Sequence, residues 1–188
     1  MKPRVVVGIS GASGAALGFR VIEILAELDA QVDLIISQAA ERTIVEELGA
    51  SALDKINELP ACRHKAFDIG ASIASGSTAT SGMIVAPCSM RTLSAVAHSL
   101  SDNLLVRAAD VHLKERRPLI LIARETPLHL GHLRAMTAVT EMGGLVMPPV
   151  PAFYHKPATI ADLVDQIARR AVDLLHIAPA TARTWKGN

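Results

Sequence analysis

Short runs of aliphatic residues alternate along this chain with segments whose apolar residues recur at helical spacing. The aliphatic runs predict five strands, at 4–9, 31–36, 82–86, 118–123 and 144–147. Helical patterns follow most of them, at 15–28, 38–48, 91–100, 128–142 and 160–175. Strands and helices that alternate in this way form a parallel sheet covered on both faces. The sequence therefore predicts a doubly wound α/β fold in three layers.

The chain length of 188 residues fits one domain with a sizeable core. No internal repeat, low-complexity tract or linker divides it. Residues 49–81 have no clean period and predict an irregular stretch with a short helix. The proline-rich segment PPVPAFYHKP, residues 148–157, predicts an ordered loop after the last strand. We therefore expect one domain over residues 1–188, ending in a helix and a tail.

The charge and apolar content narrow the classes of partner. The chain carries 19 basic and 18 acidic side chains, and this balance argues against binding nucleic acid or an anionic membrane. Half of the residues are hydrophobic but only 3% are aromatic, and the mean hydropathy is +0.33. That is more apolar surface than one small domain usually buries, so we expect a homo-oligomer.

Cysteine usage and the N-terminal pattern bear on the cellular setting. Cys62 and Cys88 lack the spacing of a metal site, so we expect no metal and a reducing environment. The first predicted strand begins too early to leave room for a signal peptide. No apolar run approaches the roughly 20 residues of a membrane span. These features predict a cytoplasmic protein.

The segment VVVGISGASGAALG, residues 5–18, joins a strand to a helix through a loop rich in glycine and serine. Backbone N–H groups and hydroxyls at a helix N-terminus favour an anion, and a phosphate is the natural guest. The spacing matches neither the dinucleotide motif nor a P-loop, so neither NAD nor ATP is indicated. A nucleophile elbow is also absent. The open alternatives are a phosphate loop and a tight turn without a ligand.

Small hydroxyl residues follow two further strands. Ser37 ends the second predicted strand, while Ser89 and Thr92 follow the third in the sequence PCSMRT, which opens a helix. The carboxyl ends of parallel strands lie at one edge of a sheet, where open α/β folds bind their ligands. We therefore expect the three strand ends to form one crevice.

Several charged residues are placed to act near that edge. Arg107 and Lys114 are seven residues apart, which puts them two turns apart on one helical face. Arg124 and Glu125 directly follow an aliphatic strand and precede Pro127. The pair is consistent either with a structural ion pair or with an anion site.

Several separated segments together resemble one known family. The segments are ISGASGA, SGSTATSGMIVAPCSMRTLSAVA, LLVRAADVHLKERRPLILIARETPL and PPVPAFYHKP with the following DLVD, and Trp185 near the C-terminus adds to them. In this order they resemble the UbiX/Pad1 family of flavin prenyltransferases, from the first strand to the tail. The resemblance implies a flavodoxin-like, Rossmann-like fold that binds FMN.

The resemblance also implies an activity and an assembly. Members of the family transfer a dimethylallyl group from dimethylallyl phosphate to reduced FMN without a metal. The product, prenylated FMN, serves a partner decarboxylase of the UbiD type. Family members often form dodecamers whose active site lies between subunits.

The family's functional residues can be carried over position by position. Those implied to bind FMN are Gly11, Ala12, Ser13, Ser37, Ser89, Thr92 and Arg107. Those implied to hold the prenyl phosphate are Lys114, Arg124, Tyr154 and Arg170, and the implied acidic site residues are Glu47 and Glu125.

The chemistry of these side chains agrees with the implied reaction. Breaking an allylic C–O bond needs charge stabilisation on the departing phosphate, which Lys114, Arg124 and Arg170 can supply with the Tyr154 hydroxyl. Either acidic residue could remove a proton from the flavin. Two alternatives remain open: a flavoprotein decarboxylase of the peptidyl-cysteine type, whose Pro-x-Met-Asn motif is absent here, and a non-catalytic flavin carrier. Tyr154 could also be a packed loop aromatic.

Overall fold

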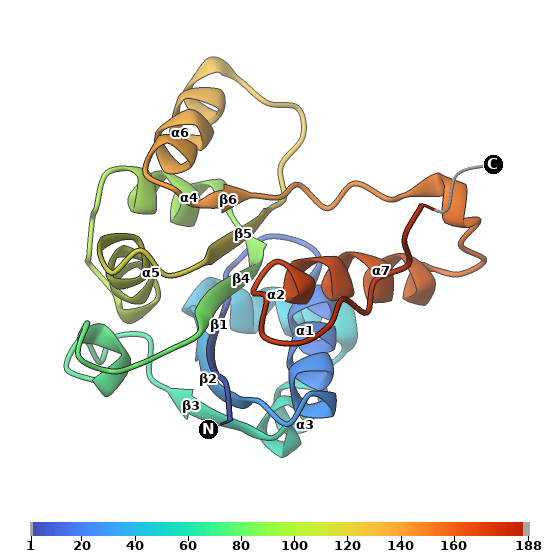
Figure 1. Ribbon diagram of the computed structural model, residues 1–188, viewed down its shortest axis with the longest axis horizontal. Helices are drawn as coiled ribbons and strands as arrows, with labels where there is room; N and C mark the ends of the chain where they lie inside the picture. Colours follow the sequence, from blue (N-terminus) through green and yellow to red (C-terminus); the bar gives the residue numbers. More distant parts are fainter. Residues whose placement is uncertain (1, 186–188) are drawn as a thin grey trace.

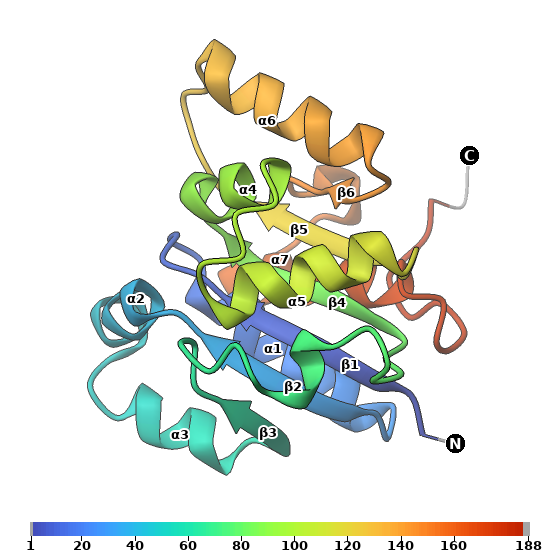
Figure 2. The same ribbon diagram turned by 90° about the vertical axis from the view of Figure 1, so that its left-hand side faces the viewer.

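One six-stranded sheet organises residues 2–185, the part of the chain that the computed structural model describes. All neighbouring strands are parallel, in the order β3-β2-β1-β4-β5-β6, and Figure 2 shows them side by side. The strands are β1 (Arg4–Ile9), β2 (Gln31–Ile36), β3 (Ala61–His64), β4 (Gly82–Cys88), β5 (Leu119–Ala123) and β6 (Leu145–Val146). The predicted doubly wound sheet is confirmed.

Helices cover both faces of this sheet, which makes three layers (Figure 1). One face packs against α1 (Ala15–Glu27), α2 (Gln38–Leu48), α3 (Ala52–Glu58) and α7 (Ile160–Asp173). The other face packs against α4 (Met90–Ala97), α5 (Leu104–Lys114) and α6 (Leu130–Glu141). Two short 3-10 turns complete the description, η1 (Ser72–Ala74) and η2 (Phe153–His155).

The central strands are aliphatic because both of their faces are buried. In β1, Val5 and Val7 belong to the core beneath α1, whereas Val6 belongs to the core beneath α5. This alternation follows from the two-residue period of a strand. Ile84 of β4 is fully buried, and its replacement by Ala is expected to cost about 2 to 5 kcal/mol.

The region 49–81 contains more regular structure than its pattern predicts. It includes the expected short helix, α3, but also the edge strand β3 and the turn η1. The β3 sequence, ACRH, is polar and partly exposed, so it lacks the aliphatic signal of the other strands. Its pairing with β2 comes from tertiary context. Elsewhere the predicted elements are present. Those at 4–9, 31–36 and 38–48 have the predicted bounds, and the ends of the others differ by at most three residues.

A buried carboxylate joins the first three strands. Asp33 of β2 accepts a 2.6 Å hydrogen bond from Arg4 Nε and lies 2.7 Å from His64 Nε2. Burial alone would raise the pKa of Asp33, but the hydrogen bonds and charges of Arg4 and His64 outweigh it and lower the pKa. The potential ligand atoms of Asp33, Cys62 and His64 lie within 4.8 Å of one another. Because Arg4 already neutralises the carboxylate, we assign this cluster a structural role.

The proline-rich segment 148–157 leaves β6 as an extended arm that runs past α7 and carries η2 (Figure 1). Apolar side chains on and beside this arm are exposed, including Val150, Phe153 and Ile160, each more than 70% exposed. These side chains are available for contacts with another subunit. Within residues 2–185, no helix has the length and apolar character needed to cross a bilayer.

Candidate functional site

The candidate site lies where the winding of the sheet changes direction. The helix after β1 covers one face of the sheet, and the helix after β4 covers the other, although the two strands are neighbours. Such a change opens a crevice at the carboxyl edge, which is the usual ligand site of this fold class. The loop of residues 10–14, between β1 and α1, lies at this edge.

Two glycines of this loop are required by the local geometry. Gly14 caps α1 with a φ of 108°, a conformation that side chains rarely adopt. A Cβ atom on Gly11 would lie 2.5 Å from the Cβ atom of Ala39 at the start of α2. The loop therefore needs glycine for close packing as well as for its turn.

A carboxylate of the chain itself occupies the anion-binding end of α1. Glu47, near the end of α2, accepts hydrogen bonds from the backbone N–H groups of Gly14 at 2.9 Å and Ala15 at 2.8 Å. A negative charge is stabilised there by the unpaired N–H groups and by the helix dipole. An anionic group thus occupies the position that the sequence indicated for an anion, but it belongs to the chain itself, and the predicted phosphate stays a prediction.

Ser13 and Arg124 act on the same carboxylate. Partial burial opposes ionisation of Glu47, but the hydrogen bonds from Ser13, Ala15 and Gly14 and the charge of Arg124 lower its pKa. Ser13, Glu47 and Arg124 come from three different elements of the fold and were all predicted site residues. The structure brings them together. Glu47 is ionised at neutral pH in this arrangement and can accept a proton or a hydrogen bond.

Ser10 fastens the ends of β1 and β4 to each other. This buried residue donates a hydrogen bond from its Oγ to the carbonyl of Pro87 at 3.0 Å, and the same Oγ accepts one from the N–H of Ser89 at 2.7 Å. Sequence reasoning noted the hydroxyl but did not give it a role. Its place directly after a buried strand, within SGASG, was the available signal.

The other predicted hydroxyls lie at helix starts, as the sequence indicated. Ser89 Oγ accepts from the Thr92 N–H at 3.3 Å and donates to Thr92 Oγ1 at 3.1 Å. Ser37 caps α2 through the N–H of Ala40, at 3.2 Å. Ala12, inside the glycine loop, is 8% exposed. The three hydroxyl-bearing strand ends therefore belong to the adjacent strands β2, β1 and β4.

Arg107 is held on α5 by two contacts. Its Nε donates to the carbonyl of Ala74 at 3.1 Å, and its Nη1 donates to Asp110 Oδ2 at 2.8 Å. Asp110 was not singled out from the sequence, although its position three residues after Arg107 was a signal for such a pair. The side chain of Arg107 is therefore oriented before any ligand binds.

Lys114 and Arg124 lie at opposite ends of β5 in the same chain. Lys114 ends α5, pairs with Glu115 and lies beside Gly76, whereas Arg124 follows the last residue of the strand. The five residues of β5 span about 16 Å. One phosphate cannot contact both side chains of a single chain, so the predicted phosphate-binding set converges only if a second copy supplies one of them.

The remaining predicted residues are exposed. Glu125 accepts from the N–H of Thr126 at 3.0 Å, and Arg170 projects from α7. Tyr154 lies in η2 on the arm, where its ring centroid is 5.1 Å from that of Trp185. No contact recorded within residues 2–185 joins these three side chains to one another.

Comparison with known proteins identifies the family. A family model described as Flavoprotein matches residues 1–172. The chain is 52% identical to a flavin prenyltransferase UbiX from Thauera aromatica over 185 residues, covering 98% of this chain and 95% of that protein. The chain belongs to the flavin prenyltransferase family. The resemblance noted in the sequence is thereby confirmed.

Two solved structures agree with this assignment. AnUbiX (PadA1), crystallised in complex with FMN and dimethylallyl pyrophosphate, matches with a TM-score of 0.94 and 42% identity, covering 100% of this chain and 99% of that one. A dodecameric FMN-dependent UbiX-like decarboxylase from Escherichia coli O157:H7 matches with a TM-score of 0.91 and 41% identity, covering 98% and 100%. The flavodoxin-like fold of the family is present over the full chain.

A more distant solved structure shares only the fold. A PPC decarboxylase mutant is 23% identical with a TM-score of 0.61 over 80% of this chain. That likeness supports the three-layer architecture and says nothing about a decarboxylase activity here.

Proposed function

We propose that this protein transfers a dimethylallyl group from dimethylallyl phosphate to reduced FMN, giving prenylated FMN. The observation that carries the proposal is the convergence of Ser13, Glu47 and Arg124 at the glycine loop, in a chain of the flavin prenyltransferase family. In the reaction the allylic C–O bond breaks and phosphate departs. N5 and C6 of the reduced flavin each form a bond to a carbon of the prenyl group and each lose a proton, and the alkene carbon between those two takes up one proton.

The glycine loop and the neighbouring strand ends supply a binding surface for FMN. The hydroxyls of Ser37, Ser89 and Thr92 suit phosphate and flavin oxygens and nitrogens, whereas the N–H groups of Gly14 and Ala15 at the start of α1 are already bound by Glu47. Arg107, already oriented by Asp110, adds a positive charge. The absence of a dinucleotide motif favours FMN over NAD or FAD.

The cationic residues suit the departing phosphate. Arg124 of one chain, with Lys114 of a neighbouring chain, would stabilise the charge that develops as the C–O bond breaks. Tyr154 and Arg170 are the further candidates for this phosphate. Glu47, which is ionised, and Glu125 are the candidates for the proton acceptor.

The assembly and the cellular role extend this proposal. We infer a homo-oligomer, with a dodecamer favoured by the UbiX-like structure described as dodecameric. The exposed apolar arm and the separation of Lys114 from Arg124 both support a site shared between subunits. The product would pass in the cytoplasm to a decarboxylase of the UbiD type.

Anaerobic incubation of the protein with reduced FMN and dimethylallyl monophosphate, followed by mass analysis of the extracted flavin, tests the reaction. We expect a flavin heavier by one C5 unit. A parallel sample with dimethylallyl diphosphate identifies the donor, because AnUbiX was crystallised with the diphosphate. Unmodified flavin in both samples would contradict the transfer reaction and leave the flavin carrier and the flavoprotein decarboxylase as the alternatives.

A further inference from the structure

Residues 176–185, the last that the structure describes, form a tail that returns along α7 and is hydrogen-bonded to that helix. The carboxylate of Asp173 accepts hydrogen bonds from the N–H groups of Thr181 at 2.8 Å and Ala182 at 3.0 Å. The hydroxyl of Thr181 also donates to this carboxylate, with Oγ1 at 3.4 Å from Asp173 Oδ1. Asp173 is 9% exposed, so these contacts are largely shielded from water.

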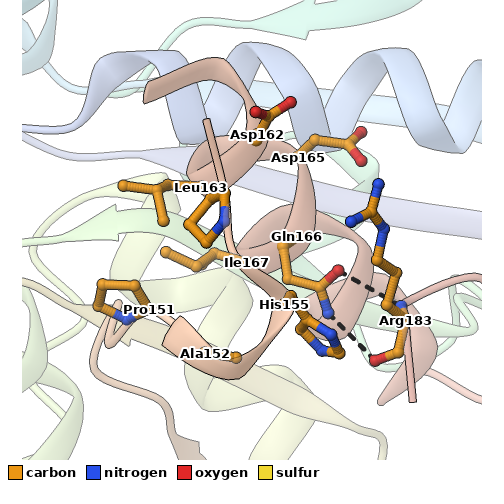
Figure 3. A pocket seen from close by; sticks show the side chains of 10 residues that line it. Pro151, Ala152, His155, Asp162, Leu163, Asp165, Gln166, Ile167 and Arg183 are labelled. Atoms are coloured by element: carbon orange, nitrogen blue, oxygen red, sulfur yellow. Dashed lines mark hydrogen bonds between the residues drawn. The ribbon is translucent and has the colours of Figure 1, made fainter. Parts of the chain in front are cut away.

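Gln166 makes the second attachment. Its side-chain amide donates to the carbonyl of Arg183 and accepts from the N–H of Arg183, both at 3.3 Å (Figure 3). Gln166 and Asp173 are seven residues apart, which places them on one side of α7, two turns apart. The tail is therefore fixed at two points along the helix.

The fixed tail places Trp185 against Tyr154. The ring centroids are 5.1 Å apart and the ring planes meet at 84°, the edge-to-face geometry that aromatic pairs favour. The arm that carries Tyr154 is separated from α7 by a cavity of about 50 Å³, bordered by Pro151, His155 and Arg183 (Figure 3). Trp185 therefore packs against Tyr154, whose ring also contacts that of His155 at a centroid distance of 4.3 Å.

We propose that Asp173 and Gln166 are positioning residues for the transfer reaction. By holding the tail they seat Trp185 against Tyr154, and so they fix the hydroxyl that the prenyl phosphate would use. Without that support Tyr154, which is 54% exposed, would sample several rotamers and would have to be ordered at each binding event. The inference rests on the proposed role of Tyr154. Neither Asp173 nor Gln166 contacts the substrate.

The single tryptophan and single tyrosine of the chain give a direct readout of the tail. Flavin-free samples of the unmodified protein, Asp173→Asn and Gln166→Ala are compared by tryptophan anisotropy decay and by energy transfer from tyrosine to tryptophan. We expect both variants to show faster tryptophan motion and stronger tyrosine emission. Asp54→Asn is the matched control, because Asp54 is exposed on α3 and makes no hydrogen bond recorded within residues 2–185.

Kinetics then test the link to Tyr154. We expect each variant to raise the KM for dimethylallyl phosphate by about fivefold, which corresponds to one weakened hydrogen bond, with a smaller change in kcat and unchanged FMN affinity. Trp185→Ala should give the same shift, and adding Asp173→Asn to it should give no further shift, because both changes act through one contact.

Unchanged tryptophan motion in both variants would overturn the inference, and so would a mobile tail with an unchanged KM. The Gln166→Ala variant removes only surface hydrogen bonds, so it keeps the test open if Asp173→Asn does not fold. An unmodified protein without turnover would contradict the proposed function instead, while the fluorescence data would still judge the attachment of the tail.

Discussion

Glu47 Oε2 lies 2.8 Å from the backbone nitrogen of Ala15, 32 residues earlier in the chain. The contact places a carboxylate from the end of α2 at the positive end of α1, beside the loop assigned to the flavin. Glu47 thus has two roles that can be separated by experiment, a structural one as a helix cap and a proposed chemical one as a proton acceptor.

The capping role predicts a pH-dependent loss of stability. Glu47→Gln should lower the free energy of unfolding at neutral pH by about 0.5 to 1 kcal/mol, since the group is exposed and solvent weakens its contacts. The pKa of Glu47 is lowered in the fold, so its contribution is present above the ordinary glutamate pKa and is lost as the pH falls through the folded value. Urea unfolding of the unmodified protein and of Glu47→Gln at several pH values measures this difference in the free energy of unfolding.

Glu46→Gln is the control for that experiment. Glu46 precedes Glu47 in the same helix, and its one recorded side-chain contact within residues 2–185 is the exposed ion pair with Arg42. We expect little change in stability from it. If the free energy of unfolding fell by the same amount in both variants, the capping contact of Glu47 would make no specific contribution to stability.

Arg124→Ala should slow transfer while leaving FMN bound. Removal of one charge-assisted contact to the departing phosphate is expected to cost about 2 to 4 kcal/mol, or roughly 30-fold to 1000-fold in rate. Anaerobic single-turnover spectra with reduced FMN and dimethylallyl monophosphate measure the rate, and a flavin titration checks binding. Lys55→Ala, which removes a positive charge from the exposed side of α3, should behave like the unmodified protein. Transfer at the normal rate in Arg124→Ala would rule out the assigned role.

Glu125→Gln should act later than Arg124→Ala. If Glu125 is the proton acceptor, an adduct linked at N5 should accumulate while ring closure at C6 slows. Mass and absorbance spectra of the quenched reaction distinguish the two flavin species. The same experiment on Glu47→Gln decides which of the two carboxylates performs the step.

The separation of Lys114 from Arg124 predicts complementation between inactive variants. Lys114→Ala and Arg124→Ala should each be nearly inactive alone. After the two are unfolded, mixed in equal amounts and refolded together, about a quarter of the sites would receive both native residues and regain activity. Activity that stays at the level of the separate variants would mean that both residues of a site come from one chain.

The Arg4–Asp33 pair predicts a second acid-sensitive contact, away from the site. Asp33 is fully buried, so Asp33→Asn should destabilise the fold by about 3 kcal/mol at neutral pH. The folded pKa of Asp33 is lowered, so this contribution persists above about pH 4 and disappears as the pH falls further. Urea unfolding of the variant and of Asp54→Asn, at one protein concentration, measures the difference.

The fold was predictable because its signals are local. Aliphatic runs such as 4–9 are buried on both faces, and their alternation with helical segments indicates a parallel sheet without further information. The polar edge strand β3 was missed because its position depends on pairing with β2 and on the contact between Asp33 and His64. The local pattern of apolar and polar residues does not indicate contacts between residues that are far apart in the sequence.

The types of residue at the site were predictable from the sequence, but the way in which the cationic residues come together was not. Hydroxyls after strands and glycine at a helix start have local causes, so Ser37, Ser89 and Gly14 lie where their sequence context indicates. Which cations share one phosphate depends on the length of β5 and on a neighbouring chain. Sequence spacing placed Arg107 and Lys114 on one helix and a strand, 118–123, between Lys114 and Arg124. It contained no information on which subunit completes the phosphate-binding set.

The double hydrogen bond of Ser10 has a consequence for turnover. Because Ser10 Oγ joins Pro87 to Ser89, the strand ends around the crevice are held in place by the protein itself. In the proposed reaction FMN is consumed and replaced in every cycle. A loop that had to fold around each new flavin would add an ordering cost to each arrival and a slow opening to each departure. Because the strand ends are already held by Ser10, we expect the rate of flavin exchange to depend on the contacts that the flavin itself makes. Such exchange suits an enzyme that releases its flavin as product.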